Sequence, residues 1–382
     1  MGHALSETTH IINFAIGQPS PDLLPVALFE RMARECTARL DPAQLNYGDY
    51  AGDPAYLESL SRFLSEHYQF PVDPSSLFLT AGASHGIDTA CRLLCAPDDV
   101  VLVEEPTYFL ALEIFASQGL RAVPVAMDEQ GVRVDALREA LEMHPNAKVL
   151  YTIPAHHNPT SVTMSAERRR EVLALTRGAG VTVVADEVYQ LLHFDGRVPP
   201  PAPFAAEVHG GGVISVGSFS KLLAPAMRVG WVQSDPSTIA RLCALGVIRS
   251  GGAINQVGSL LVAASIDSGV LDAHLRECLV PALAARAQVM GDALTHGLGN
   301  SAVRWRQATG GYFYWLHLPQ DCKTDALLAN SREAGVGFHP GKLFSAAGEQ
   351  GNTLRLSFAH YPVGEVEEGI KRLVDQLHQH GV

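Results

Sequence analysis

The stretch "VGSFSKLLAPAMRVGW" (216–231) decides the fold class, because it places hydroxyl and charged side chains directly after a buried strand. The apolar run "VISV" (213–216) predicts that strand. Ser218 and Lys221 follow it, and Arg228 comes soon after in a segment with almost no other charge. On its own, a lysine at this point is best interpreted as a surface residue. The rest of the chain must therefore show whether the strand end belongs to a site.

Strand and helix patterns alternate around this stretch, from about residue 75 to 235. Short β-rich apolar runs predict strands at 77–79, 100–103, 148–153, 181–184, 213–216 and 230–232. Helical patterns lie between several of them, such as "SAERRREVLALTRGAG" with Ser165 as its N-cap. The alternation predicts an α/β fold with a mostly parallel sheet covered by helices on both faces.

The C-terminal part of the chain has a different pattern. From about residue 300, strands are expected in "GGYFYWLHLP", "GVGFHPG" and "NTLRLSFA", with helices near 324–334 and 363–379. These elements predict a second, smaller α+β domain. The segment at 236–300, which links the two parts, is largely helical by pattern.

Composition excludes several classes of function. The chain has 382 residues, 47% of them hydrophobic, and a formal net charge of −12. That charge argues against nucleic acid or an anionic membrane as a partner, and no apolar run approaches the length of a membrane span. The six cysteines are scattered without the spacing of a metal site, which indicates free thiols in a reducing cytoplasm and no bound metal.

Polar groups follow the first three predicted strands at the edge where ligands bind in open parallel sheets. The turn "TAGASHG" opens a helix, and the free N–H groups of a helix start suit a phosphate. Tyr108 follows the next strand and offers a ring for stacking, and Asn158 follows the third and offers an amide. Each has an ordinary structural alternative: a tight turn, a core tyrosine and an Asn-Pro turn.

The next two strand ends add an acid and a cation. Asp186 and Glu187 follow directly on buried apolar residues, where a carboxylate is costly unless it is paired. Lys221 and Arg228 then follow the strand of the opening stretch. Together with the anion-binding turn, the aromatic ring and the amide, they make up the set that pyridoxal 5′-phosphate (PLP) requires.

The whole chain resembles the class I/II aminotransferase family of fold type I PLP-dependent enzymes. The similarity runs in order through "AIGQPSPDLLP", "LNYGDYAGDPAYLESL", "TAGASHGIDTACRLL", "EEPTYFLAL", "NPT", "DEVY", "SFSKLLAPAMRVGW" and "NTLRLSFA". The resemblance implies a large domain with a mixed, mostly parallel sheet between helices, plus a small α+β domain. The implied parts are an N-terminal segment (1–45) that packs with the small domain and a dimer partner, a PLP-binding domain (46–285) and a C-terminal domain (286–382).

The resemblance also implies a role for each matching residue. Lys221 would form the internal aldimine and act as the general base once freed, and Asp186 would keep the ring nitrogen protonated. Tyr108 would stack on the ring. The other implied cofactor ligands are Asn158 and Tyr189 at the ring oxygen, Ala83, Ser84, Ser218 and Arg228 at the phosphate, and Tyr47 at the partner subunit's phosphate. The implied substrate ligands are Gly17, Asn158 and, at the α-carboxylate, Arg355.

The implied reaction moves an amino group from an L-amino acid to a 2-oxo acid in a homodimer with shared active sites. Two features depart from the family pattern: Ser161 stands where a glycine is usual, and His156 and His157 precede Asn158. An imidazole near the cofactor could redirect protons or meet oxygen, so an oxidase, decarboxylase or lyase is an alternative. An aminotransferase-like effector domain of a transcription regulator is a more remote one.

Overall fold

An eight-stranded sheet forms the centre of the computed structural model, which describes residues 10–196 and 198–382. In spatial order the strands are β2 (Leu77–Thr80), β9 (Gly230–Ser234), β8 (Val213–Ser218), β7 (Thr182–Asp186), β6 (Ala147–Thr152), β3 (Val100–Glu105), β4 (Arg121–Asp128) and β5 (Gly131–Val132). Strands β8, β7, β6, β3 and β4 are parallel, whereas β9 is antiparallel to β2 and β8, and β5 to β4. The mostly parallel sheet and the six predicted strands are confirmed.

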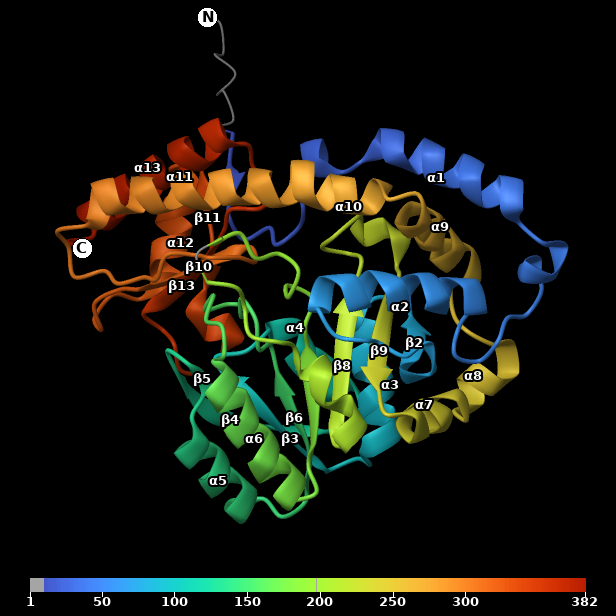
Figure 1. Ribbon diagram of the computed structural model, residues 1–382. Helices are drawn as coiled ribbons and strands as arrows, with labels where there is room; N and C mark the ends of the chain where they lie inside the picture. Colours follow the sequence, from blue (N-terminus) through green and yellow to red (C-terminus); the bar gives the residue numbers. More distant parts are fainter. Residues whose placement is uncertain (1–9, 197) are drawn as a thin grey trace, which may run out of the picture.

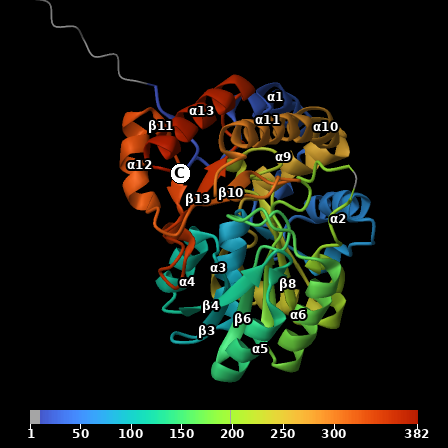
Figure 2. The same ribbon diagram turned by 90° about the vertical axis from the view of Figure 1, so that its left-hand side faces the viewer.

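Helices cover both faces of this sheet (Figure 2). On one face lie α3 (Ala83–Leu94) and α4 (Phe109–Ser117), and on the other lie α5 (Val134–Met143) and α6 (Ala166–Gly178). Alternate strand residues join different cores: Val101 packs with the core that contains Ile87 of α3, and Leu102 with the core that contains Val172 of α6. Burial on both faces explains why these strands are continuous apolar runs. The predicted N-cap is confirmed, since the Ser165 hydroxyl accepts a hydrogen bond from the Arg168 N–H.

The C-terminal part forms a smaller unit beside the sheet (Figure 1). Its three-stranded antiparallel sheet contains, in order, β10 (Phe313–His317), β13 (Thr353–Ser357) and β12 (His339–Pro340). Its helices are α11 (Val280–Leu298), α12 (Thr324–Glu333) and α13 (Val363–Gln379). Strand β1 (Ile12–Asn13) pairs in parallel with β11 (Val336–Gly337), so the N-terminal segment is attached to the C-terminal unit.

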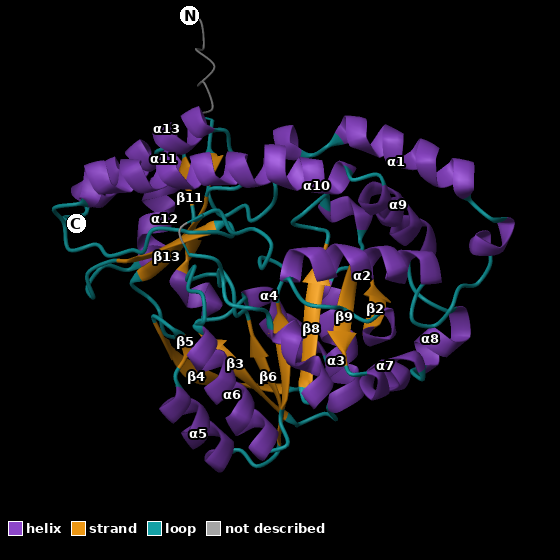
Figure 3. Cartoon of the chain, in the orientation of Figure 1, coloured by secondary structure: helices purple, strands orange, loops and turns teal. Residues whose placement is uncertain are grey.

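The remaining helices lie at the other end of the molecule (Figure 3). They are α1 (Val26–Arg39), α2 (Pro54–Tyr68), α7 (Pro236–Cys243), α8 (Gly246–Gly251), α9 (Gln256–Asp267) and α10 (Val270–His274), with α1 and α2 both packed on α9. The domain boundaries after residues 45 and 285 stay predictions, and α11 runs unbroken across the second. In the described ranges, no helix combines the length and apolar character needed to cross a membrane.

Candidate active site

A cavity of about 590 Å³ lies at the carboxyl ends of the parallel strands. Its wall includes eleven of the twelve residues predicted for the site: Gly17, Ala83, Ser84, Tyr108, Asn158, Asp186, Tyr189, Ser218, Lys221, Arg228 and Arg355. The twelfth, Tyr47, is 83% exposed and is not among the residues that line this cavity in the described ranges. The polar residues that follow five different strands in the sequence therefore meet in one space.

One end of the cavity is built for an anion. Helix α3 begins at Ala83, after Gly82 with a positive φ of 85°, and no side chain caps its first N–H groups. The Arg228 guanidinium lies against this turn and donates from Nη2 to the Ala81 carbonyl at 2.8 Å. A Cβ at position 82 would lie 2.9 Å from the same nitrogen. Free N–H groups, the helix dipole and an arginine are the groups that bind a phosphate.

Asp186, the last residue of β7, keeps one oxygen available. The Tyr151 hydroxyl donates to its Oδ2 at 2.9 Å, whereas its Oδ1 is buried without a hydrogen-bond partner among the described residues. Burial raises the pKa of Asp186 to about 6, against the lowering effect of the Tyr151 hydrogen bond. A buried acceptor without a donor fits a protonated ring nitrogen, which would satisfy that oxygen and favour its charge.

Tyr151 is a site residue that sequence reasoning missed. It lies inside the apolar run "KVLYTI", which predicts only a buried strand. The signal was its hydroxyl, because a phenol in a fully buried aliphatic run needs a hydrogen-bond partner.

Lys221 follows β8 and is part of the cavity wall. Its Nζ donates to the Gly17 carbonyl at 2.9 Å and lies 5.3 Å from the ring centroid of Tyr312. Burial, followed by the nearby positive charge of Arg355, lowers the pKa of Lys221 to about 8, although Asp186 acts in the opposite direction. The amine is therefore easier to deprotonate near neutral pH than an ordinary lysine, as a general base requires.

Hydrogen bonds and aromatic rings fix the guanidinium of Arg355, on β13, in the cavity wall. Its Nη1 donates to the Asn158 side-chain oxygen at 3.0 Å and its Nη2 to the Ala15 carbonyl at 2.8 Å. Its guanidinium lies 4.2 Å from the Phe313 ring centroid and 5.0 Å from that of Phe344. Burial lowers the pKa of Arg355 to about 10, and its Nε has no hydrogen-bond partner in the described ranges. A desolvated, planar guanidinium recognises a carboxylate through two parallel hydrogen bonds.

Two tyrosines complete the wall. Tyr108 directly precedes α4 and is half-buried, and burial raises its pKa to about 12. Tyr189 is fully buried, with its ring centroid 5.5 Å from that of Tyr312 and 5.9 Å from that of Phe313. Burial also raises the pKa of Tyr189, so both phenols stay neutral and can donate a hydrogen bond.

The two histidines that depart from the family pattern are buried outside the described cavity wall. The His156 ring stacks on His193 at 5.3 Å between centroids, and a Cβ on Gly310 would lie 2.3 Å from it. Burial, with a smaller contribution from His193, lowers the pKa of His156 to about 3. His157 lies between Glu104 and Thr160, with its Nε2 3.1 Å from the Glu104 Oε2. Both rings serve packing and hydrogen bonding behind the site.

Ser161 has a local explanation as well. Its φ is 59°, in the left-handed region that favours glycine. The Ser161 hydroxyl donates to the Phe313 carbonyl, a bond that glycine could not make. The departure therefore ties the "NPTS" turn to β10 and adds no group to the described cavity wall.

Comparisons with known proteins agree with this geometry. The sequence profile described as aminotransferase class I and II matches residues 9–373. Aromatic-amino-acid aminotransferase 1 of Thermococcus litoralis is 31% identical over 98% of this chain and 89% of its own length. An uncharacterized HTH-type transcriptional regulator of Bacillus subtilis is 28% identical over 94% of this chain and 72% of its own. The crystal structure of Pyrococcus horikoshii kynurenine aminotransferase with PMP, KYN and KYA has a TM-score of 0.90 at 30% identity, covering 98% of this chain and 92% of that one.

Proposed function

Because this chain belongs to the class I and II aminotransferase family of PLP-dependent, fold type I enzymes, we propose that it transfers the amino group of large neutral L-amino acids to 2-oxo acids. The substrate class rests on which charged side chains line the cavity. Lys221, Arg228 and Arg355 are the only lysine or arginine residues of the described wall. In this proposal they serve proton transfer, the cofactor phosphate and the substrate α-carboxylate, respectively. No cation of that wall is left for the side-chain carboxylate of an acidic donor.

The rest of the wall is mainly apolar or aromatic. It includes Ile16, Phe109, Leu110 and Phe313, with the His339 ring 5.4 Å from that of Phe109, and also the neutral side chains of Asn13 and Gln18. Burial and the charge of Arg355 lower the pKa of His339 to about 4, so this imidazole is neutral near pH 7. A mainly apolar pocket whose other polar groups are neutral favours aliphatic and aromatic side chains. The names of the Thermococcus and Pyrococcus relatives support the same class.

The residues of the wall supply the cofactor's ligands in this proposal. The start of α3 at Ala83 and Ser84, with Ser218 and Arg228, would hold the phosphate. Asp186 Oδ1 would accept a hydrogen bond from the ring nitrogen. Asn158 and Tyr189 would contact the ring oxygen, and Tyr108 would cover the ring face. When bound, PLP takes up the amino group and withdraws electrons from the α-carbon of the substrate.

Protein groups then orient the substrate and move its proton. Arg355 binds the α-carboxylate with Asn158 beside it, and Gly17 leaves room on the substrate side, since a Cβ there would lie 3.3 Å from the Phe313 ring. The Lys221 Nζ accepts the α-proton, which its lowered pKa favours. Asp186 stays ionised once a positive ring nitrogen faces it.

We also propose that the enzyme is a homodimer. Large apolar side chains that are exposed in the single chain gather on α1, α8, α9 and the loop before α2: Val26 (78%), Leu45 (64%), Tyr47 (83%), Tyr50 (47%), Val247 (67%) and Val257 (51%). Large exposed apolar side chains of this kind are typical of a subunit interface. Tyr47 would reach the phosphate of the partner subunit's cofactor. The described cysteines are all free, which supports a reducing, cytoplasmic environment.

A donor panel tests the proposed function. The PLP-loaded enzyme is given phenylalanine, tyrosine, leucine, alanine or aspartate with pyruvate as the acceptor, in air and under nitrogen, with Lys221→Ala as the control. We expect kcat/KM to be about tenfold or more higher for phenylalanine or leucine than for aspartate, because an unpaired carboxylate would be buried. Aspartate as the best donor would refute the substrate class. A requirement for oxygen, or cofactor binding without turnover, would refute simple transamination.

A further inference from the structure

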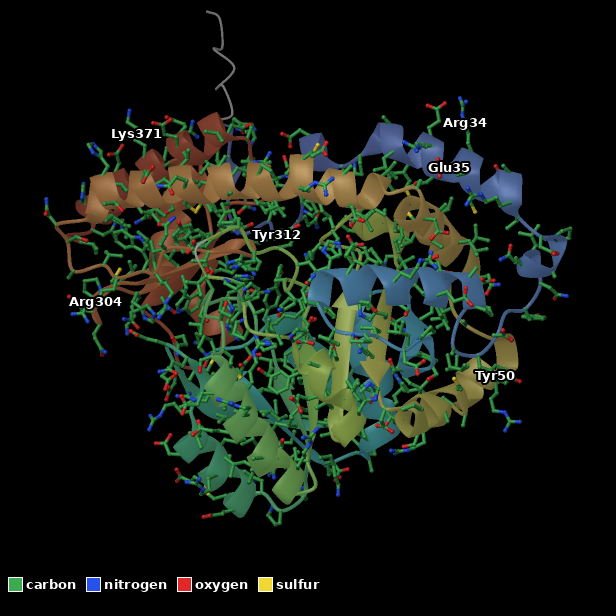
Figure 4. The ribbon with its side chains drawn as sticks, viewed as in Figure 1. Arg34, Glu35, Tyr50, Arg304, Tyr312 and Lys371 are labelled. Carbon is green, nitrogen blue, oxygen red and sulfur yellow. The ribbon has the colours of Figure 1, made fainter. Side chains whose placement is uncertain are left out.

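We propose that Tyr312 is a positioning residue for Lys221, which fixes the free lysine side chain for proton transfer at the substrate α-carbon. The inference rests on the proposed role of Lys221. Tyr312 directly precedes β10 and is fully buried. Figure 4 places it in the middle of the molecule, between helix α11 and the central sheet.

Tyr312 contacts Lys221 in two independent ways. Its hydroxyl donates to the Lys221 carbonyl oxygen at 3.2 Å, so it holds the main chain of the lysine. Its ring centroid lies 5.3 Å from the Lys221 Nζ, within the ~6 Å at which a cation is attracted to an aromatic face. One side chain therefore holds the lysine at both its main chain and its amine.

The position of Tyr312 is itself fixed by its surroundings. Gly311 has a left-handed φ of 66°, and its N–H donates to the Leu192 carbonyl at 2.9 Å. The Tyr312 carbonyl accepts from the Phe358 N–H at 3.0 Å, which continues the pairing of β10 with β13. A Cβ on Gly311 would lie 2.7 Å from that of His156, so the loop has little freedom to move. Tyr312 is thus a rigid support.

The ring also has an electrostatic effect on the amine. Burial, followed by the charges of Arg355 and Arg228, lowers the pKa of Lys221, whereas Asp186 raises it. The aromatic face of Tyr312 adds a second stabilising group for the ammonium form. Loss of the ring should therefore lower the pKa of Lys221, whereas loss of the hydroxyl alone should only loosen its placement.

Three variants separate these effects. Tyr312→Phe removes the hydroxyl, Tyr312→Leu removes the ring as well, and Tyr314→Phe is the matched control. Tyr314 is also fully buried, and its hydroxyl donates to the Ala287 carbonyl at 2.8 Å, a bond within the small domain. The holoenzyme is prepared with pyridoxamine 5′-phosphate, which leaves Lys221 unbonded. The pKa of Lys221 is then measured by competitive acetylation across a pH series, with mass spectrometry of its peptide.

We expect the pKa of Lys221 to fall by about 0.5 to 1.5 units in Tyr312→Leu and to stay unchanged in the other two variants. Single-turnover transfer of the α-proton should slow by about tenfold in Tyr312→Phe, with the amino-acid KM within about twofold. Tyr314→Phe should match the wild type in both measurements.

A proton-transfer rate in Tyr312→Phe equal to that of Tyr314→Phe would overturn the inference, and so would a change confined to KM. This comparison decides the question even if Tyr312→Leu does not fold. Borohydride reduction of the PLP form tests the underlying assignment separately. If PLP is not trapped on Lys221, the proposed function fails; if it is trapped there and Tyr312→Phe is unaffected, only this inference fails.

Discussion

The hydroxyl of Tyr151 should set the pH range in which the enzyme holds its cofactor. It donates to Asp186 Oδ2 at 2.9 Å in a buried setting, and the other carboxylate oxygen has no partner among the described residues. A hydrogen bond to a charged group contributes about 1.5–3 kcal/mol, which corresponds to about 1–2 pKa units. Tyr151→Phe should therefore raise the pKa of Asp186 from about 6 to between about 7 and 8.

The consequence is weaker cofactor binding near neutral pH. At about pH 7 the wild-type carboxyl is mostly ionised, whereas in Tyr151→Phe half or more of it is protonated and cannot pair with a positive ring nitrogen. We expect the Kd for PLP to rise by about two- to tenfold at pH 7, with the difference shrinking toward about pH 9. Absorbance titrations across this pH range, with Tyr314→Phe as the control, measure it. A pH-independent change in Kd, or none, would refute the reasoning.

Three further predictions concern Gly82 in the turn before α3, Arg355 at the proposed carboxylate site and the buried Asp186. Gly82→Ala should weaken PLP binding by about tenfold or more, because its Cβ would lie 2.9 Å from Arg228 Nη2; Gly269→Ala, with a similar φ of 70° and no atom within 4 Å, is the control and should bind PLP normally. Arg355→Lys should raise the KM for amino donors by about tenfold while the Kd for PLP changes by less than about twofold; equal changes in both would contradict the assignment. Because burial raises the pKa of Asp186 from 3.8 to about 6, the carboxyl destabilises the PLP-free protein increasingly as pH rises through that range. Asp186→Asn should then be up to about 3 kcal/mol more stable than the wild type above pH 6 and no more stable below pH 4, as measured by urea unfolding; a pH-independent difference would argue against it.

The parts of the fold that the sequence predicts are those whose signal is local. Strands β3, β6, β7 and β8 are buried on both faces, apart from Lys148 of β6 and the residues at some strand ends. Each therefore contains an apolar run, and the polar group that ends each run is visible beside it. Strand β4 was not predicted, since only Val125 of its eight residues is buried and Pro124 interrupts the run. Its place near the sheet edge, between β3 and the two-residue β5, explains that pattern.

The site residues that sequence reasoning missed act through long-range contacts. Tyr151 and Tyr312 look like core aromatics, and their partners, Asp186 and Lys221, are far away in the sequence. Gly17 was predicted as a site residue, but the hydrogen bond from Lys221 to its carbonyl was not. A contact made by a main-chain group cannot be recognised from the residue type. Conversely, His156 stood out by its type but is buried outside the described cavity wall. Residue identity shows the kind of chemistry, whereas packing decides which groups reach the site.

The most direct test of the central claim is to find where the cofactor is bonded. The PLP-loaded enzyme is reduced with borohydride, digested and analysed by mass spectrometry, with Lys221→Arg treated in parallel. We predict one phosphopyridoxyl group per chain, on the peptide that contains Lys221, and none in the variant. Modification of another lysine, or equal labelling of Lys221→Arg, would contradict the account.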